Sequence, residues 1–277
     1  MPEHETLETL VGRIRSLEIQ GAKEIAVESL KWLRPFVREN GFGKEFLKVV
    51  SALDASRPTA VVLHNCLEIL KDEKNIRTID RLLDNLANAS KYIGNHGSRL
   101  IPAGATVMTH CHSGEALSVI KHAFASGNKL RVIATETEPR HQGFMTARDL
   151  TCAGIPVTLI TDSAIAFFMK DVDLVLVGSD AMRKEGNVNK IGTLMMAMVA
   201  RDMKRPFYVA GDTLKLDRRK NLIIEERSIH EVYHGLHGIR GAAVRNPAFD
   251  VTPWKYVKRV VTEKGVLTTG NLMRLMR

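Results

Sequence analysis

The chain has 277 residues, of which 44% are hydrophobic and 5% aromatic, and its formal net charge is +9. This apolar content is typical of a folded protein and excludes extended disorder, while the length allows two modest domains. The moderate positive charge suits a phosphorylated ligand, an acidic partner or a solvated surface. Without zinc-finger spacing or a long basic run, we expect no direct nucleic-acid binding.

Three widely spaced cysteines, Cys66, Cys111 and Cys152, argue against a disulfide framework and for a reducing compartment. Residues 1–5 carry neither a basic head nor an apolar run, so we expect no signal peptide. No stretch approaches the roughly 20 apolar residues that a membrane span needs. The sequence therefore predicts a cytoplasmic protein with no membrane partner.

Apolar residues recur at helical spacing throughout the first hundred residues, and predict helices around 7–14, 25–33, 59–70 and 75–94. Pro35, followed by Gly41 and Gly43, indicates a boundary after the second of these helices. The stretch Gly94–Ser98 contains two glycines and precedes a change of pattern. We therefore expect an N-terminal helical domain over 1–97 and a second domain over 98–277.

From residue 100 onward, short apolar runs alternate with helical segments. Strands are predicted at 105–109, 130–134, 157–160, 174–177, 207–210 and 259–262, and helices at 114–126, 146–153, 162–169 and 192–203. Continuous apolar strands that alternate with helices predict an α/β fold with a doubly wound, mostly parallel sheet.

In such a sheet, ligands bind beyond the carboxyl ends of the strands. The first strand ends in Thr109-His110-Cys111-His112-Ser113-Gly114, where Ser113 is a candidate helix cap. The helix N-terminus and the flanking histidines would favour the thiolate of Cys111. The alternative is a buried cysteine that acts as a small hydrophobic residue.

Polar residues follow two further strands. Asp180 comes after the run 174–177 and, together with Cys111, would supply an acid and a base that face one substrate. Asn189 and Lys190 suit a phosphate or a hydroxyl group. The alternatives are a turn cap for Asp180 and a helix-entry loop for Asn189 and Lys190.

We expect no metal and no cofactor. Adjacent residues of a strand point to opposite faces, so His110, Cys111 and His112 would not converge on one ion. No Gly-x-Gly-x-x-Gly motif follows a predicted strand, which argues against a nicotinamide or flavin cofactor.

Five ordered motifs resemble one superfamily: Arg57-Pro58-Thr59-Ala60-Val61, Thr109–Ser113, Gly178-Ser179-Asp180, Asn189–Thr193 and Asn246-Pro247-Ala248-Phe249-Asp250. It comprises the alpha, beta and delta regulatory subunits of translation initiation factor 2B, their archaeal relatives, and two sugar-phosphate isomerases. Those isomerases act on methylthioribose 1-phosphate and ribose 1,5-bisphosphate. The resemblance covers roughly residues 20–267, and it implies a Rossmann-like C-terminal domain and a homodimer.

The resemblance also implies roles for individual residues. In an active isomerase Cys111 would accept a proton and Asp180 would donate one. The positions implied to hold the ligand are Gln20, Gly21, Ala22, Lys23, Arg57, Ser113, Gly114, Glu115, Asn189, Lys190 and Lys215.

Two positions depart from the isomerase pattern. Gln20 and Glu138 stand where the isomerases carry arginines, which removes two strong phosphate contacts and adds a repulsive charge; Lys23 and Arg140 are candidate replacements. On this ground we favour a factor-2B-like regulatory subunit that binds archaeal initiation factor two or a phosphorylated sugar or nucleotide. The alternative is a sugar-phosphate isomerase that uses Cys111 and Asp180.

Overall fold

The computed structural model describes residues 5–19, 21–232 and 243–276. The chain divides into two compact units, Met1–Asn88 and Ala89–Arg277. No helix within the described residues is long and apolar enough to cross a membrane.

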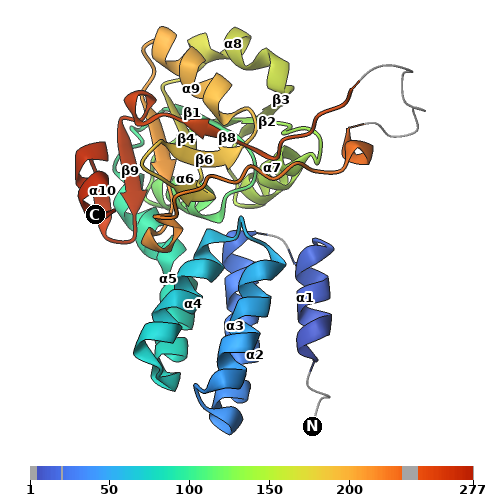
Figure 1. Ribbon diagram of the computed structural model, residues 1–277. Helices are drawn as coiled ribbons and strands as arrows, with labels where there is room; N and C mark the ends of the chain where they lie inside the picture. The colour runs from blue at the N-terminus through green and yellow to red at the C-terminus, as the bar shows by residue number, and fades with distance from the viewer. Residues whose placement is uncertain (1–4, 20, 233–242, 277) are drawn as a thin grey trace. The chain divides into compact units, whose positions relative to one another are not determined.

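The first unit is helical, as the apolar spacing predicts. It contains α1 (Leu7–Arg15), α2 (Ala22–Asn40), α3 (Lys44–Ser56), α4 (Val61–Glu73) and the first half of α5 (Ile76–Ser98). Helices α2, α3 and α4 pack side by side (Figure 1) around fully buried side chains that include Leu33 and Phe46. Helix α2 continues through Pro35 for five more residues, and the expected boundary falls at Gly41, which follows the last helical residue.

The division between the units falls inside α5, upstream of the glycine-containing stretch at which the sequence pattern changes. Gly94 and Gly97 lie within this helix. Their lack of a side chain allows α6 (Gly114–Ala125) to approach closely. A Cβ atom on Gly94 would lie 2.5 Å from Ser118 Oγ, and one on Gly97 would lie 2.6 Å from Val119 Cγ2. These glycines therefore serve helix packing and do not form a linker.

The second unit has the α/β fold that the sequence predicts. Its seven-stranded sheet has the order β10-β9-β7-β4-β1-β2-β3, and every neighbouring pair is parallel except β9 and β10. The strands are β1 (Thr106–Thr109), β2 (Arg131–Thr135), β3 (Val157–Ile160), β4 (Leu174–Val177), β7 (Phe207–Ala210), β9 (Arg259–Thr262) and β10 (Gly265–Leu267).

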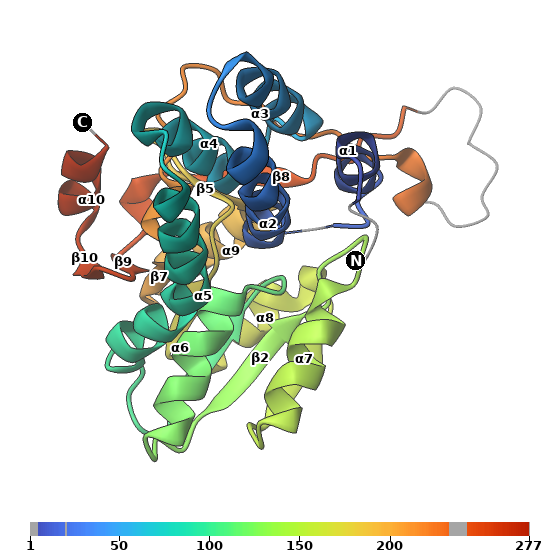
Figure 2. The same cartoon turned by 90° about the horizontal axis from the view of Figure 1, so that it is seen from below.

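Helices cover both faces of this sheet. The end of α5 with α6 and α7 (Gln142–Cys152) forms one layer, and Figure 2 shows α6 and α7 side by side. The other layer is built from α8 (Ile165–Phe168), α9 (Thr193–Asp202) and α10 (Thr269–Leu275). Strand order reverses at β1, which lies between β2 and β4, and such a reversal opens a crevice beyond the carboxyl ends of the strands.

A second, three-stranded antiparallel sheet was not expected. It consists of β5 (Ala181–Met182), β6 (Asn187–Lys190) and β8 (Phe249–Thr252), with β6 in the middle. The alternative of a helix-entry loop at Asn189 and Lys190 is therefore wrong, because this polar segment is a buried strand.

Candidate functional site

The first strand exit is built as predicted. β1 ends at Thr109, and α6 begins at Gly114. The Ser113 hydroxyl accepts the N–H of Ala116 at 3.3 Å and thereby caps the helix. The cap fixes where the intervening loop, including Cys111, leaves the sheet.

Cys111 has a left-handed backbone, with φ = 66°, which few non-glycine residues adopt. Its N–H donates to Thr137 Oγ1 at 2.9 Å, and its carbonyl accepts from the hydroxyl of Thr146 at 2.8 Å. Asp162 in turn accepts the N–H of Thr137 at 3.0 Å. Thus Cys111 is held in an unusual conformation from the β2 exit and from α7, by threonines whose role the sequence did not reveal.

The expectation of a thiolate at Cys111 was wrong. Burial raises the pKa of this thiol to about 11; the charge of Lys190 opposes the rise and that of Asp180 adds to it. Desolvation of the anion therefore outweighs the favourable charges. At neutral pH, Cys111 is a protonated thiol and can act as an acid.

His110 is a buried positioning residue. Its Nε2 lies 2.7 Å from the carbonyl of Ile191, and its Nδ1 lies 2.6 Å from Thr135 Oγ1. Since a carbonyl only accepts, we assign the proton to Nε2 and let Nδ1 accept from the threonine. Burial lowers the pKa of this imidazole, so His110 is neutral and links β1 to the start of α9.

Asp180 stands at the end of the neighbouring strand, β4. A Cβ atom on Gly178 would lie 2.4 Å from Ser113 Oγ, so the two strand exits are in close contact. The N–H of Asp180 donates to the Val188 carbonyl at 2.9 Å, which ties the residue to β6. The charge of Asp180 acts on the thiol of Cys111, so the two residues lie near each other beyond the ends of adjacent strands.

Strand β6 carries Asn189 and Lys190 to the same place. The side-chain amide of Asn189 donates to Thr193 Oγ1 at 3.0 Å. Lys190 is 7% exposed, and its Nζ lies 5.6 Å from the ring centroid of Phe249. Because its charge lowers the pKa of Cys111, Lys190 forms the cationic part of the crevice beside the thiol.

Glu115 and Lys215 form a buried ion pair at the other side of the site. Lys215 Nζ lies 2.9 Å from Glu115 Oε1, and Ser113 donates to Glu115 Oε2 at 3.1 Å. Burial acts to raise the pKa of Glu115, but Lys215 holds it below its usual value. Burial likewise opposes the charge of Lys215, yet Glu115 and Asp212 raise its pKa. Both groups are therefore charged.

The remaining expected ligand residues belong to the first unit. Gly21 precedes α2 with φ = 82°, and Ala22 and Lys23 form the start of that helix. Arg57 ends α3. Gln20 lies outside the described residues.

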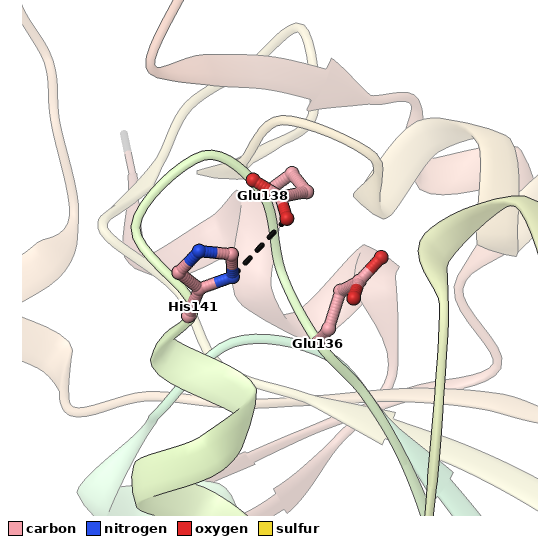
Figure 3. A group of neighbouring side chains, drawn as sticks. All are labelled: Glu136, Glu138 and His141. Atoms are coloured by element: carbon pink, nitrogen blue, oxygen red, sulfur yellow. Dashed lines mark ion pairs between the residues drawn. The ribbon is translucent and has the colours of Figure 1, made fainter. Parts of the chain in front are cut away.

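The loop after β2 contains three groups that could hold a cation (Figure 3). One ligand atom from each of Glu136, Glu138 and His141 lies within 4.8 Å of the others. His141 Nδ1 lies 3.1 Å from Glu138 Oε1. Both of these side chains are exposed, and an exposed ion pair of this kind needs no metal. The neighbouring Arg140 contacts Glu231 Oε1 at 3.2 Å, so its charge is already paired.

The fold and the site define a Rossmann-like α/β protein with a thiol, a carboxylate and a lysine in the crevice where strand order reverses. The chain belongs to the Initiation factor 2 subunit family, whose model matches residues 18–269.

Relatives within this family carry different names. The chain is 37% identical to ribose 1,5-bisphosphate isomerase of Methanocaldococcus jannaschii, over 96% of this chain and 93% of the relative. It is 38% identical to methylthioribose-1-phosphate isomerase of Geobacter sulfurreducens, over 96% of this chain and 88% of that relative. The solved structure of translation initiation factor eIF-2B of Pyrococcus horikoshii OT3 matches with a TM-score of 0.85 and 26% sequence identity. The match covers 98% of this chain and 99% of the chain in that structure.

Proposed function

We propose that the protein is an aldose–ketose isomerase that acts on a pentose 1-phosphate. The observation that carries this proposal is that Cys111 and Asp180 follow two adjacent strands and that the charges of Asp180 and Lys190 both act on the thiol. Relatives at 37% and 38% identity that are named isomerases support it. The preference for a regulatory subunit, drawn from Gln20 and Glu138, thus gives way to the alternative.

The protonated thiol suggests how the proton transfers are divided. Asp180 would accept the proton from C2 while the bond between C1 and the ring oxygen breaks, and would then protonate that oxygen. Cys111 would donate its proton to C1 of the resulting enol and recover one from the hydroxyl on C2. Two protons leave the sugar and two are returned, so the reaction is an isomerisation. This assignment reverses the direction first expected for Cys111 because its pKa is raised to about 11.

A turnover assay tests the proposal. Wild-type protein should convert methylthioribose 1-phosphate, ribose 1-phosphate or ribose 1,5-bisphosphate to the corresponding ketose. Cys111→Ser and Asp180→Asn should each lower kcat by about 100-fold or more, in line with loss of a general acid or base. Cys152→Ser, at an exposed cysteine on α7, is the matched control. Absence of turnover with all three compounds would overturn the proposal.

The second candidate function is a translation factor subunit, which the likeness to the Pyrococcus horikoshii OT3 structure favours. Purified archaeal initiation factor two, passed over the immobilised protein, should be retained if this candidate holds. If the factor is not retained and the protein shows isomerase turnover, only the isomerase function remains.

We also propose that the protein is a homodimer. Exposed apolar side chains lie on the neighbouring helices α8 and α9, namely Phe167, Met195 and Met198, and such side chains often mark an interface. Light scattering after size-exclusion chromatography should give twice the mass of the chain, and a monomer at micromolar concentration would contradict this.

A further inference from the structure

The ion pair of Glu115 and Lys215 has a consequence for the substrate. Both side chains are under 10% exposed, and the N–O distance of 2.9 Å is that of a charge-assisted hydrogen bond. Lys215 would have to give up this partner before it could bind a phosphate. Separating a buried pair leaves an uncompensated charge, which is strongly unfavourable.

A second carboxylate, Asp212, acts on the same ammonium. Asp212 precedes the turn that carries Lys215, and its Oδ2 atom is buried and has no hydrogen-bond partner among the described residues. Glu263 accepts the N–H of Thr213 at 2.9 Å, and its charge acts on Asp212. Glu115 and Asp212 therefore both act on the ammonium of Lys215, and the cluster has no surplus positive charge to offer an anion.

Lys215 lies close to the residue before Asp180, because a Cβ atom on Gly211 would lie 3.0 Å from Ser179 Cβ and 3.4 Å from Lys215 Cδ. The charge of Asp180 acts on Lys215. Lys190, in contrast, acts on Cys111 and His110. The surroundings of the two lysines thus differ: the ammonium of Lys215 is paired with Glu115, whereas the charge of Lys190 acts on Cys111.

The reaction fixes which end of the sugar meets which cluster, if the proposed function holds. Cys111 serves C1, so the phosphate on C1 lies beside Lys190. Asp180 serves the ring oxygen, which is bonded to C4, so C5 points toward Glu115, Asp212 and Lys215.

We propose that Glu115 is a specificity-determining residue that makes the protein selective for a sugar monophosphate with an uncharged group on C5. It occupies the ammonium of Lys215 and places negative charge where a second phosphate would lie. Like charges brought together in this way exclude the wrong ligand. This inference rests on the proposed isomerase function for the orientation of the sugar.

The test compares ribose 1-phosphate with ribose 1,5-bisphosphate, which differ only at C5. Wild-type protein should give a kcat/KM about 100-fold higher for the monophosphate. This ratio corresponds to two factors of ten in transition-state affinity. An equal or higher kcat/KM for the bisphosphate would overturn the inference and leave the isomerase function standing. If neither compound is turned over, and methylthioribose 1-phosphate is not turned over either, the isomerase function fails. Calorimetric titration with the same two compounds then tests the selectivity alone. The inference requires that the monophosphate bind more tightly than the bisphosphate.

Variants connect the selectivity to the charge. Glu115→Gln keeps the shape of the side chain and should shift the kcat/KM ratio at least about tenfold toward the bisphosphate. Asp212→Asn should shift it in the same direction, and serves if Glu115→Gln fails to fold, as judged by circular dichroism. Glu68→Gln, on the half-exposed pair with Lys71 in α4, is the matched control. An unchanged ratio in a folded Glu115→Gln protein would overturn the role of Glu115.

Discussion

The backbone N–H of Cys111 donates to the hydroxyl of Thr137 at 2.9 Å, so the conformation of the candidate acid depends on a side chain from the next strand exit. Thr137 is fully buried, and water cannot replace its hydroxyl there. Loss of a hydrogen bond that leaves a buried donor unpaired costs about 1–3 kcal/mol.

We expect Thr137→Val to lower kcat of the isomerase by about tenfold or more, because the loop that carries Cys111 loses this bond. Thr137→Ser retains the hydroxyl and should retain most of the activity. Steady-state kinetics of the two variants checks this. Equal activity of the Val and Ser variants would show that the hydroxyl does not position the thiol.

The contact between Gly178 and Ser113 predicts a second effect. A Cβ atom at position 178 would lie 2.4 Å from Ser113 Oγ, so Gly178→Ala must push the exits of β1 and β4 apart. A displacement of about 1 Å can cost 100-fold in rate, and we expect a loss of this size in kcat. Gly43→Ala, where nothing lies within 4 Å of the added atom, should be silent. Normal kinetics in Gly178→Ala would contradict the close contact.

The raised pKa of Cys111 predicts slow alkylation. Since the pKa is about 11 rather than 9.0, the thiolate fraction at pH 7.5 is about 100-fold below that of an ordinary thiol. The rate with iodoacetamide, followed by mass spectrometry in Cys152→Ser protein, should rise about tenfold per pH unit until pH approaches 11. Lys190→Met should slow it further, because the ammonium favours the thiolate. A plateau in the rate below pH 9 would instead indicate a resting thiolate.

Two helical glycines should respond to alanine in opposite directions. Gly12→Ala adds a methyl group in open space and should stabilise the protein by about 0.5–1 kcal/mol through helix propensity. Gly97→Ala places the methyl group 2.6 Å from Val119 and should destabilise it by about 1–3 kcal/mol. Thermal unfolding of both variants checks the signs. A Tm for Gly97→Ala at or above that of wild type would be inconsistent with this packing.

The sequence predicted the α/β fold and the six parallel strands of the large sheet, because each of those strands is a short apolar run between turn signals, whereas the antiparallel edge strand β10 was not expected. It missed β6 because Asn187 and Asn189 are polar. The fold buries them by giving their amides partners, the Gly178 carbonyl and the Thr193 hydroxyl.

The candidate site could be predicted in outline only. The sequence placed Cys111 and Asp180 after two strands of one sheet, and the adjacency of those strands, β1 and β4, comes from the structure. The protonation state of Cys111 and the pairing of Glu115 with Lys215 depend on burial and on contacts across 100 residues of sequence, which a linear pattern does not contain. The catalytic and ligand-binding roles of these residues stay predictions.

The buried strand β6 determines how Lys190 meets a ligand. An exposed lysine loses up to about 1.5–2 kcal/mol of side-chain conformational entropy when it is immobilised. Lys190 is buried, paired with Phe249 of β8 and close to the ring of that residue, so most of this loss occurs during folding. A phosphate that arrives at this ammonium meets a preorganised partner, and the saving corresponds to about tenfold or more in affinity.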